Sequence, residues 1–254
     1  MKKILTTLAC VVILASSLSA NAIKVELGVG AWAQASSGEL SYTDASNVTA
    51  TDKSKEDSQT QAYLWVLLKH PVPILPNLRL EYANLNNNGL ATGSFKNFTA
   101  PTNSKTTLGV TEFDIIPYYN ILDNTLWITL DLGLDLKVAD IKYEVDAVVV
   151  DAVTTDYSDS KTVVIPLVYL RARVEIPKTN IGLESDLKYI SYGGNTVYDA
   201  RVKIDYTFDI KSPIKPAIEL GYRIQKIKLE DDSAGDANVD LDFSGVYAGL
   251  MLRF

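Results

Sequence analysis

Histidine and acidic side chains are the first places to look for chemistry in this chain. Histidine is the side chain that most often acts as a general acid or base, and the sequence contains one, His70. It begins the segment His70-Pro-Val-Pro-Ile-Leu-Pro76, whose prolines are typical of a turn. Four further acidic residues could look catalytic, namely Glu112, Asp114, Asp131 and Asp135. We predict that His70 is an exposed turn residue, that the four carboxylates pair with Arg and Lys, and that the chain is not an enzyme.

Two short patterns could hold a metal or a cofactor. The run Asp236-Ala-Asn238-Val-Asp240-Leu-Asp242 begins like a calcium-binding loop, but Leu241 replaces the required glycine and the closing Glu is absent. We read it as a solvated acidic loop, with weak bridging of divalent cations as the alternative. The run Gly28-Val-Gly30-Ala-Trp-Ala33 loosely resembles a dinucleotide fingerprint, but no helix follows it. We therefore predict neither a cofactor nor a metal.

The first 22 residues have the pattern of a secretory signal peptide. Lys2 and Lys3 are followed by an apolar stretch and by the small-residue cleavage pattern Ala20-Asn21-Ala22. Cys10 suggests a lipoprotein signal, but the apolar stretch continues well past it. Cleavage after residue 22 leaves 232 residues, 23–254, with no cysteine and therefore no disulfides. This mature chain has 22 basic and 31 acidic residues, a net charge of −9, which argues against binding to nucleic acid.

Alternation of apolar and polar residues dominates the mature chain. Residues 126–138 are the clearest case, because leucines and other aliphatic residues occupy every second position over thirteen residues. No apolar run approaches the roughly 20 residues that a membrane-spanning helix needs. The same reasoning predicts ten strands, at about 24–36, 61–70, 77–85, 107–118, 126–138, 162–176, 181–192, 195–210, 218–224 and 239–254.

A glycine pair organises the strands near residue 190. Gly193-Gly194 is a strong signal for a two-residue hairpin turn, which sets Tyr192 opposite Asn195. This register produces three pairs of opposite charge, Lys188–Asp199, Asp186–Arg201 and Glu184–Lys203. The preceding turn, at Pro177–Asn180, sets Ile176 opposite Ile181 and extends the pairs into two rows, Arg171–Asp186–Arg201 and Arg173–Glu184–Lys203. We predict that these eight charged residues form a network inside the fold.

The two faces of the strands predict the fold class. Apolar residues point the same way in strand after strand, and the sequence offers no second layer to cover them, as a soluble sandwich would require. Polar stretches at 37–60, 86–106, 144–160 and 230–238 alternate with short turns. We therefore predict an all-β fold, a single antiparallel transmembrane β-barrel of about ten strands with apolar residues on lipid and charges in the lumen.

The end of the chain carries a resemblance to a known class of proteins. Phe254 is preceded by alternate apolar residues, among them Leu252 and Leu250, and this resembles the C-terminal signature of Gram-negative outer-membrane proteins. The segment Ser191-Tyr192-Gly193-Gly194-Asn195 resembles a poorly characterised proteobacterial outer-membrane family named for a Gly-Gly pair. The resemblance implies a place in the outer membrane with both termini in the periplasm. It also implies lipid and lipopolysaccharide as surroundings and the barrel assembly machinery as a partner during biogenesis.

Two functional classes remain open from the sequence. The first is a structural or surface-interaction barrel whose loops contact an unknown extracellular partner. The second is a narrow channel for small solutes. A barrel of about eight strands is just filled by side chains, and wide pores have about sixteen strands or more. Ten strands with near-balanced lumenal charge therefore favour the first class.

Overall fold

The protein is a single β-barrel. The computed structural model describes residues 23–43, 49–55, 59–72, 74–95, 98–150, 153–230 and 238–254. The predicted signal peptide and most of the predicted loop at 230–238 lie outside these residues. The strands are β1 (Lys24–Thr43), β2 (Thr49–Lys55), β3 (Gln59–Lys69), β4 (Asn77–Phe95), β5 (Phe98–Thr125), β6 (Ile128–Val150), β7 (Val153–Glu175), β8 (Ile181–Tyr192), β9 (Asn195–Thr207), β10 (Lys215–Leu229) and β11 (Asn238–Arg253).

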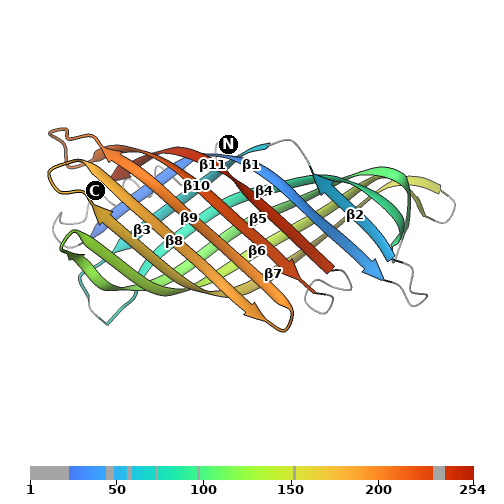
Figure 1. Ribbon diagram of the computed structural model, residues 1–254, viewed down its shortest axis with the longest axis horizontal. Helices are drawn as coiled ribbons and strands as arrows, with labels where there is room; N and C mark the ends of the chain where they lie inside the picture. The colour runs from blue at the N-terminus through green and yellow to red at the C-terminus, as the bar shows by residue number, and fades with distance from the viewer. Residues whose placement is uncertain are drawn as a thin grey trace.

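Consecutive strands pair antiparallel around the barrel, and β11 pairs with β1 to close it (Figure 1). Strands β2 and β3 both pair with β1 and together form one barrel strand with a small break between them. The fold is therefore a closed barrel of ten antiparallel strands, as the alternation predicts. Among the described residues there is no helix long and apolar enough to cross a membrane.

The glycine turn lies where the sequence places it. Gly193 and Gly194 have φ angles of 57° and 85°, which residues other than glycine rarely adopt. Tyr192 pairs with Asn195 across this turn. The register that follows sets Asp186 opposite Arg201, and the β7–β8 register sets Arg173 opposite Glu184. The turn chemistry and the apolar face together are thus sufficient to fix the register of β7, β8 and β9.

The predicted loops are largely wrong. Most of residues 86–106 belong to β4 and β5, most of 144–160 belong to β6 and β7, and β1 and β2 cover much of 37–60. These segments are rich in Ser, Thr, Asn and Asp, and they carry no continuous apolar face. Their backbone groups nevertheless bond to neighbouring strands, so the ladder continues beyond the region that the apolar pattern marks.

One strand boundary also differs from the prediction. Leu126 and Trp127 form the β5–β6 turn instead of beginning a strand, and both have positive φ angles, 53° and 67°. Leu126 is 77% exposed and Trp127 is 54% exposed. The alternation of residues 126–138 continues through the turn, and this is why pattern alone did not detect it. Strand β9 ends at Thr207, although alternation continues to Ile210.

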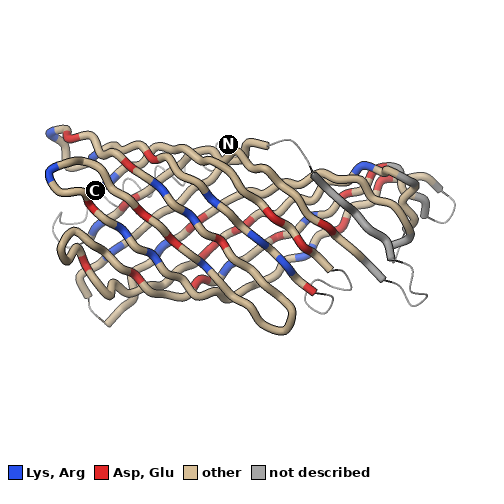
Figure 2. Tube along the Cα trace, viewed as in Figure 1, with Lys and Arg blue, Asp and Glu red and all other residues tan. Residues whose placement is uncertain are grey.

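The two faces of the wall differ in chemistry as predicted. Outward positions on β6, β7 and β10 carry apolar side chains such as Leu134, Val164 and Leu220, each more than half exposed. Inward positions carry charges of both signs, and residues of opposite sign face each other on several neighbouring strands, as on β7, β8 and β9 (Figure 2). Strands β8 to β11 follow the same division, so one continuous apolar surface surrounds a polar interior.

Candidate functional site

The lumen is the candidate functional site, and its first part is a set of buried charges. We call it the charged core. Eight of its described residues are basic and ten are acidic. They are Arg79, Lys137, Arg171, Arg173, Lys188, Arg201, Lys203 and Arg223, and Glu81, Glu112, Asp114, Asp131, Asp135, Glu184, Asp186, Asp199, Asp205 and Glu219. All eight residues of the predicted network belong to it.

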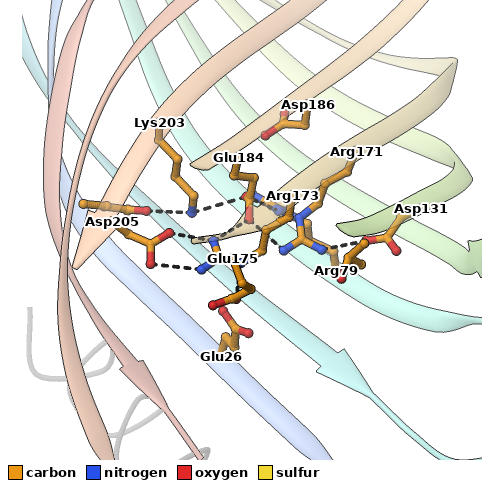
Figure 3. A network of polar contacts seen from close by, with 12 residues as sticks. Glu26, Arg79, Asp131, Arg171, Arg173, Glu175, Glu184, Asp186, Lys203 and Asp205 are labelled. Carbon is orange, nitrogen blue, oxygen red and sulfur yellow. Dashed lines mark hydrogen bonds and ion pairs between the residues drawn. The ribbon is translucent and has the colours of Figure 1, made fainter. Parts of the chain in front are cut away.

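Most of the predicted cross-strand pairs form ionic contacts. Asp186 accepts from the Arg201 guanidinium at 2.7 Å, and the Lys188 and Asp199 side chains lie 3.3 Å apart. Glu184 lies 3.3 Å from both of its predicted neighbours, Arg173 and Lys203. Figure 3 shows that Arg173 of β7 and Lys203 of β9 both point toward the Glu184 carboxylate.

The predicted register sets Arg171 opposite Asp186, and the structure confirms it, but the Arg171 guanidinium bonds other carboxylates. The two residues face each other along the backbone, but the Arg171 guanidinium bonds Asp131 at 2.6 Å and Glu184 at 2.7 Å (Figure 3). An arginine side chain is long enough to pass its direct neighbour, and the tilt of barrel strands brings residues of other rows within its reach. Backbone register therefore does not decide which charges meet.

Lys188 occupies the centre of a carboxylate cluster. Its ammonium bonds Glu81 at 2.5 Å, contacts Asp114 as well, and lies 3.3 Å from Asp199. The oxygen atoms of these three acids lie within 4.8 Å of one another, a spacing that could hold a metal ion. The lysine ammonium occupies the place of such an ion, so the cluster is a set of ion pairs.

Asp135 departs from the prediction that the lumenal carboxylates are paired. It is fully buried, and neither carboxylate oxygen has a hydrogen-bond partner among the described residues. By contrast, Asp131 accepts from Arg171, and Lys137 bonds both Glu112 and Asp114. The acidic residues of the charged core outnumber the basic ones, which leaves Asp135 without a cation of its own.

Aromatic residues of the second barrel strand complete the charged core, and the sequence reasoning missed them. Tyr63 and Trp65 of β3 both donate to the carboxylate of Glu219, at 2.7 Å and 3.1 Å. The Lys203 ammonium lies 4.4 Å from the centre of the Trp65 ring, which is a cation–π distance. Both faces of residues 61–70 are apolar, so alternation could not show which face is inside.

The second part of the lumen is an apolar layer, which the sequence analysis did not predict. We call it the apolar cap, and it consists of Leu85, Leu108, Val110, Val197, Ile227, Leu241 and Phe243, each at most 5% exposed. On β4, β5, β9 and β10, the apolar residue lies on the Gly193–Gly194 side of the charged ones. For example, Val197 precedes Asp199 and Ile227 follows Arg223. The cap therefore closes the lumen at the end that contains the glycine turn.

The outer face changes chemistry at the same level. The paired row Tyr82–Phe113–Val138 on β4, β5 and β6 is apolar and points outward. Two residues closer to the Gly193–Gly194 end of each strand, the row Asn84–Thr111–Asp140 is polar and also points outward. Where the outside changes from apolar to polar, the inside changes from charged to apolar. Beyond this level the outward side chains in these rows are polar, and the buried inward side chains are the apolar cap together with polar residues such as Ser36, Asn87 and Thr106.

The charged core contains one small void beside its aromatic residues. A cavity between Trp32, Arg79 and Tyr247 has a volume of about 10 Å³, which is enough for about one water molecule. The Arg223 guanidinium stacks on Trp32 at 4.5 Å, and Tyr63 packs edge-on against Tyr247. The charged core is thus packed solidly by its own side chains at this point.

His70 lies at the opposite end of the barrel from the cap and holds a turn together. Its Nδ1 accepts from the Val72 N–H at 3.1 Å, so its Nε2 carries the proton and donates to the Pro76 carbonyl at 3.0 Å. The chain end lies at this same end of the barrel, where the Phe254 N–H donates to the Val25 carbonyl at 2.9 Å. This bond completes the seam between β11 and β1, while Leu250 points outward and is 65% exposed.

Comparison with known proteins identifies the fold and no more. No family model and no curated protein matches the sequence. The outer membrane protease OmpT from Escherichia coli is similar in structure, with a TM-score of 0.56, 10% identity, and coverage of 94% of this chain and 99% of that one. The transport unit of the autotransporter AIDA-I from Escherichia coli has a TM-score of 0.39 at 9% identity, covering 92% of this chain and 90% of that one. Neisserial surface protein A has a TM-score of 0.30 at 11% identity, covering 93% of this chain and 98% of that one. The similarity to OmpT, with its TM-score above 0.5, shows that the chain shares the fold of outer-membrane β-barrels.

Proposed function

We propose that the chain is an integral outer-membrane barrel with a closed lumen, whose role is structural or lies in contacts made by its exposed end. One observation carries the proposal: an apolar outer band surrounds a lumen filled first by ion pairs and then by the apolar cap. Apolar atoms on the outside are stable only against lipid or another apolar surface. A lumen without a continuous water path does not suit a solute channel.

The proposal includes an orientation. The short turns and both ends of the described chain belong in the periplasm, and the Gly193–Gly194 end belongs outside, as in barrels with short periplasmic turns. Lipid and lipopolysaccharide surround the apolar band. The barrel assembly machinery recognises Phe254, Leu252 and Leu250, in keeping with the C-terminal signature and the resemblance to the Gly-Gly family. Residues 1–22 direct export and are removed.

We further propose that the barrel is not an enzyme. The similar fold of a protease does not transfer an activity at 10% identity. His70 bonds backbone groups of its own turn through both ring nitrogens, and the carboxylates of the charged core are buried away from any substrate.

Conductance across planar bilayers tests the closed lumen directly. The folded barrel is expected to give no stepwise current in 1 M salt, because the apolar cap excludes hydrated ions. Heat-modifiable migration on gels shows first that the protein has inserted in its folded form. Regular single-channel steps from the inserted protein would contradict the proposal and support the alternative, a narrow channel.

A further inference from the structure

The turn between β5 and β6 has an unusual sequence for its backbone conformation. Thr125 pairs with Ile128, so the turn consists of Leu126 and Trp127, and both have positive φ angles. Two-residue turns with positive φ at both positions favour Asn-Gly or Gly-Gly, because the Cβ atom of other residues approaches the backbone too closely. Leucine and tryptophan therefore do not suit the turn itself.

The glycine turn at the opposite end of the barrel provides the comparison. Gly193 and Gly194 form the same kind of turn, with φ angles of 57° and 85°, against 53° and 67° at Leu126 and Trp127. The fold thus uses the expected glycines at one end and two bulky apolar residues at the other. A strained backbone conformation that is kept by bulky residues indicates a role beyond the turn.

The neighbouring β3–β4 turn extends the apolar surface around Leu126 and Trp127. We call this surface the apolar rim, and it consists of Ile74, Leu75, Ile121, Leu126 and Trp127, each more than half exposed. The Tyr119 hydroxyl of β5 donates to the Ile74 carbonyl at 2.9 Å. The Lys69 ammonium, at the end of β3, bonds the Asp123 carboxylate of β5. The two turns are therefore tied together and present one surface.

The rim continues the outer apolar face of the barrel. The outward residues of β6 from Ile128 to Leu134 are all apolar, so no polar level separates the rim from the apolar band. The β7–β8 turn at the same end differs, because the exposed residues Lys178, Thr179 and Asn180 lie there. Continuity with the apolar band favours lipid, and not a periplasmic protein, as the occupant of the rim.

We propose that the apolar rim is a membrane anchor that inserts Leu126 and Trp127 into the inner leaflet of the outer membrane. This inference rests on the proposed place and orientation of the barrel. Tryptophan suits the boundary between headgroups and acyl chains, because its ring is apolar and its N–H is polar. The Lys69–Asp123 ion pair belongs at the same boundary, since charges are costly in hydrocarbon. The rim thus fixes the depth of β3 to β6, while the β7–β8 turn lies in water.

Tryptophan fluorescence in vesicles tests the depth of the rim. The chain has three tryptophans, and Trp32 and Trp65 are buried in the lumen, so the difference between wild type and Trp127→Phe isolates the signal of Trp127. Lipids brominated near the headgroup end of the acyl chain are expected to quench this signal at least about twofold more than lipids brominated near the chain end. Quenching by neither lipid, or stronger quenching at the chain end, would overturn the inference.

Thiol reactivity compares two turns at the same end of the barrel. The mature chain has no cysteine, so Leu126→Cys and Lys178→Cys each carry a single thiol. Lys178 also has a positive φ angle, 63°, which makes it a matched control in backbone conformation. A water-soluble maleimide is expected to react at least about tenfold faster at position 178, because apolar surroundings suppress the thiolate at position 126. Equal rates at the two positions would contradict the anchor.

Insertion is measured first, by heat-modifiable migration of each variant. A wild-type chain that fails to insert contradicts the outer-membrane location itself. An inserted barrel whose Trp127 lies in water contradicts only the anchor.

Discussion

The charged core and the apolar cap fill the same lumen by opposite means. Lys188 and its three carboxylates lie where the outer wall is apolar, and Leu241 and Phe243 lie where the outer wall is polar. At the lower level the outward side chains are apolar, and the polar groups are confined to the inside. At the upper level the outward side chains include charged residues, and apolar residues return inside beside a few buried polar ones such as Ser36 and Asn87. The main filling of the lumen is therefore the inverse of the outer face at each level.

This difference has energetic consequences. Ion pairs in the charged core are mutually dependent, because removing one partner leaves the other charge buried and unpaired. Side chains of the apolar cap are stabilised by the apolar area that they bury and by packing. Truncating one of them therefore costs free energy at that position without leaving a charge unpaired elsewhere. Substitutions in the two regions should consequently destabilise the barrel in different ways. This difference tests whether the lumen is divided into two regions or changes gradually in polarity along its axis.

The largest effect is expected from removing the central cation of the charged core. Lys188→Met leaves Glu81, Asp114 and Asp199 facing one another, and it should cost about 3–5 kcal/mol of unfolding free energy. Urea unfolding in lipid vesicles measures this. Because the freed oxygens lie within 4.8 Å of one another, millimolar calcium should recover part of the loss.

Lys188→Arg is the matched control, since it keeps a cation in the cluster and should cost less than Lys188→Met. A loss below about 1 kcal/mol for Lys188→Met, the range of exposed pairs, would mean that water reaches the cluster. The charged core would then not be a sealed region.

A substitution in the apolar cap should come next. Leu241→Ala removes a side chain that is 1% exposed and should cost about 2–5 kcal/mol through lost burial and the cavity left behind. Calcium should recover none of it. Leu250→Ala on the outward face of the same strand is the control and should cost less, because lipid fills the space. Equal losses at the two positions would indicate that the cap is loosely packed.

The sequence predicted the fold well wherever the two faces differ in polarity. The strand register around Gly193–Gly194 followed from turn chemistry and one apolar face. Apart from the strand boundaries at Leu126 and Thr207, prediction failed at three kinds of position for physical reasons. Residues 61–70 are apolar on both faces, so Tyr63 and Trp65 could not be assigned to the inside. Beyond the apolar band the outward positions become polar and several inward positions become apolar. The sequence of a regular strand in this region therefore resembles that of an acidic loop.

The segment around Asp240 illustrates this inversion. Asp240 and Asp242 point outward and bond Lys226, while Leu241 between them belongs to the cap. From Asn238 onward, the run that resembled a calcium loop is therefore part of strand β11 and not a solvated loop, while Asp236 and Ala237 lie outside the described residues. The choice of partner within the charged core was the third failure, because register fixes Cα neighbours and long arginine side chains reach further.

The partners of Asp186 provide a finer test. Asp186→Ala combined with Arg201→Ala should show a coupling energy of about 1–3 kcal/mol, since their side chains bond directly. Asp186→Ala combined with Arg171→Ala should be additive within about 0.5 kcal/mol, although the two residues are backbone neighbours. Both cycles use urea unfolding in vesicles. Strong coupling to Arg171 would restore the row that the sequence suggested and would contradict the contact of Arg171 with Asp131.

The smallest effect is expected from an ion pair outside the apolar band, and it sharpens the contrast with Lys188. Partial burial lowers the pKa of Lys226, but its hydrogen bonds to Asp240 and Asp242 outweigh this, so the pKa lies above the ordinary lysine value of 10.5. A raised pKa means that the contribution to stability is complete below about pH 10.5 and is lost as the pH rises through the folded-state value. Lys226→Met should cost about 0–1 kcal/mol at pH 7, and less in 1 M salt, because exposed charges are screened. Lys228→Met, which removes a more exposed pair with Glu230, is the control and should cost no more. Unfolding of the three proteins at pH 7 and pH 11, in low and high salt, checks this. A loss that persists unchanged in high salt and at pH 11 would mean that Lys226 is held by packing, and the polar outer level would then begin further along β10.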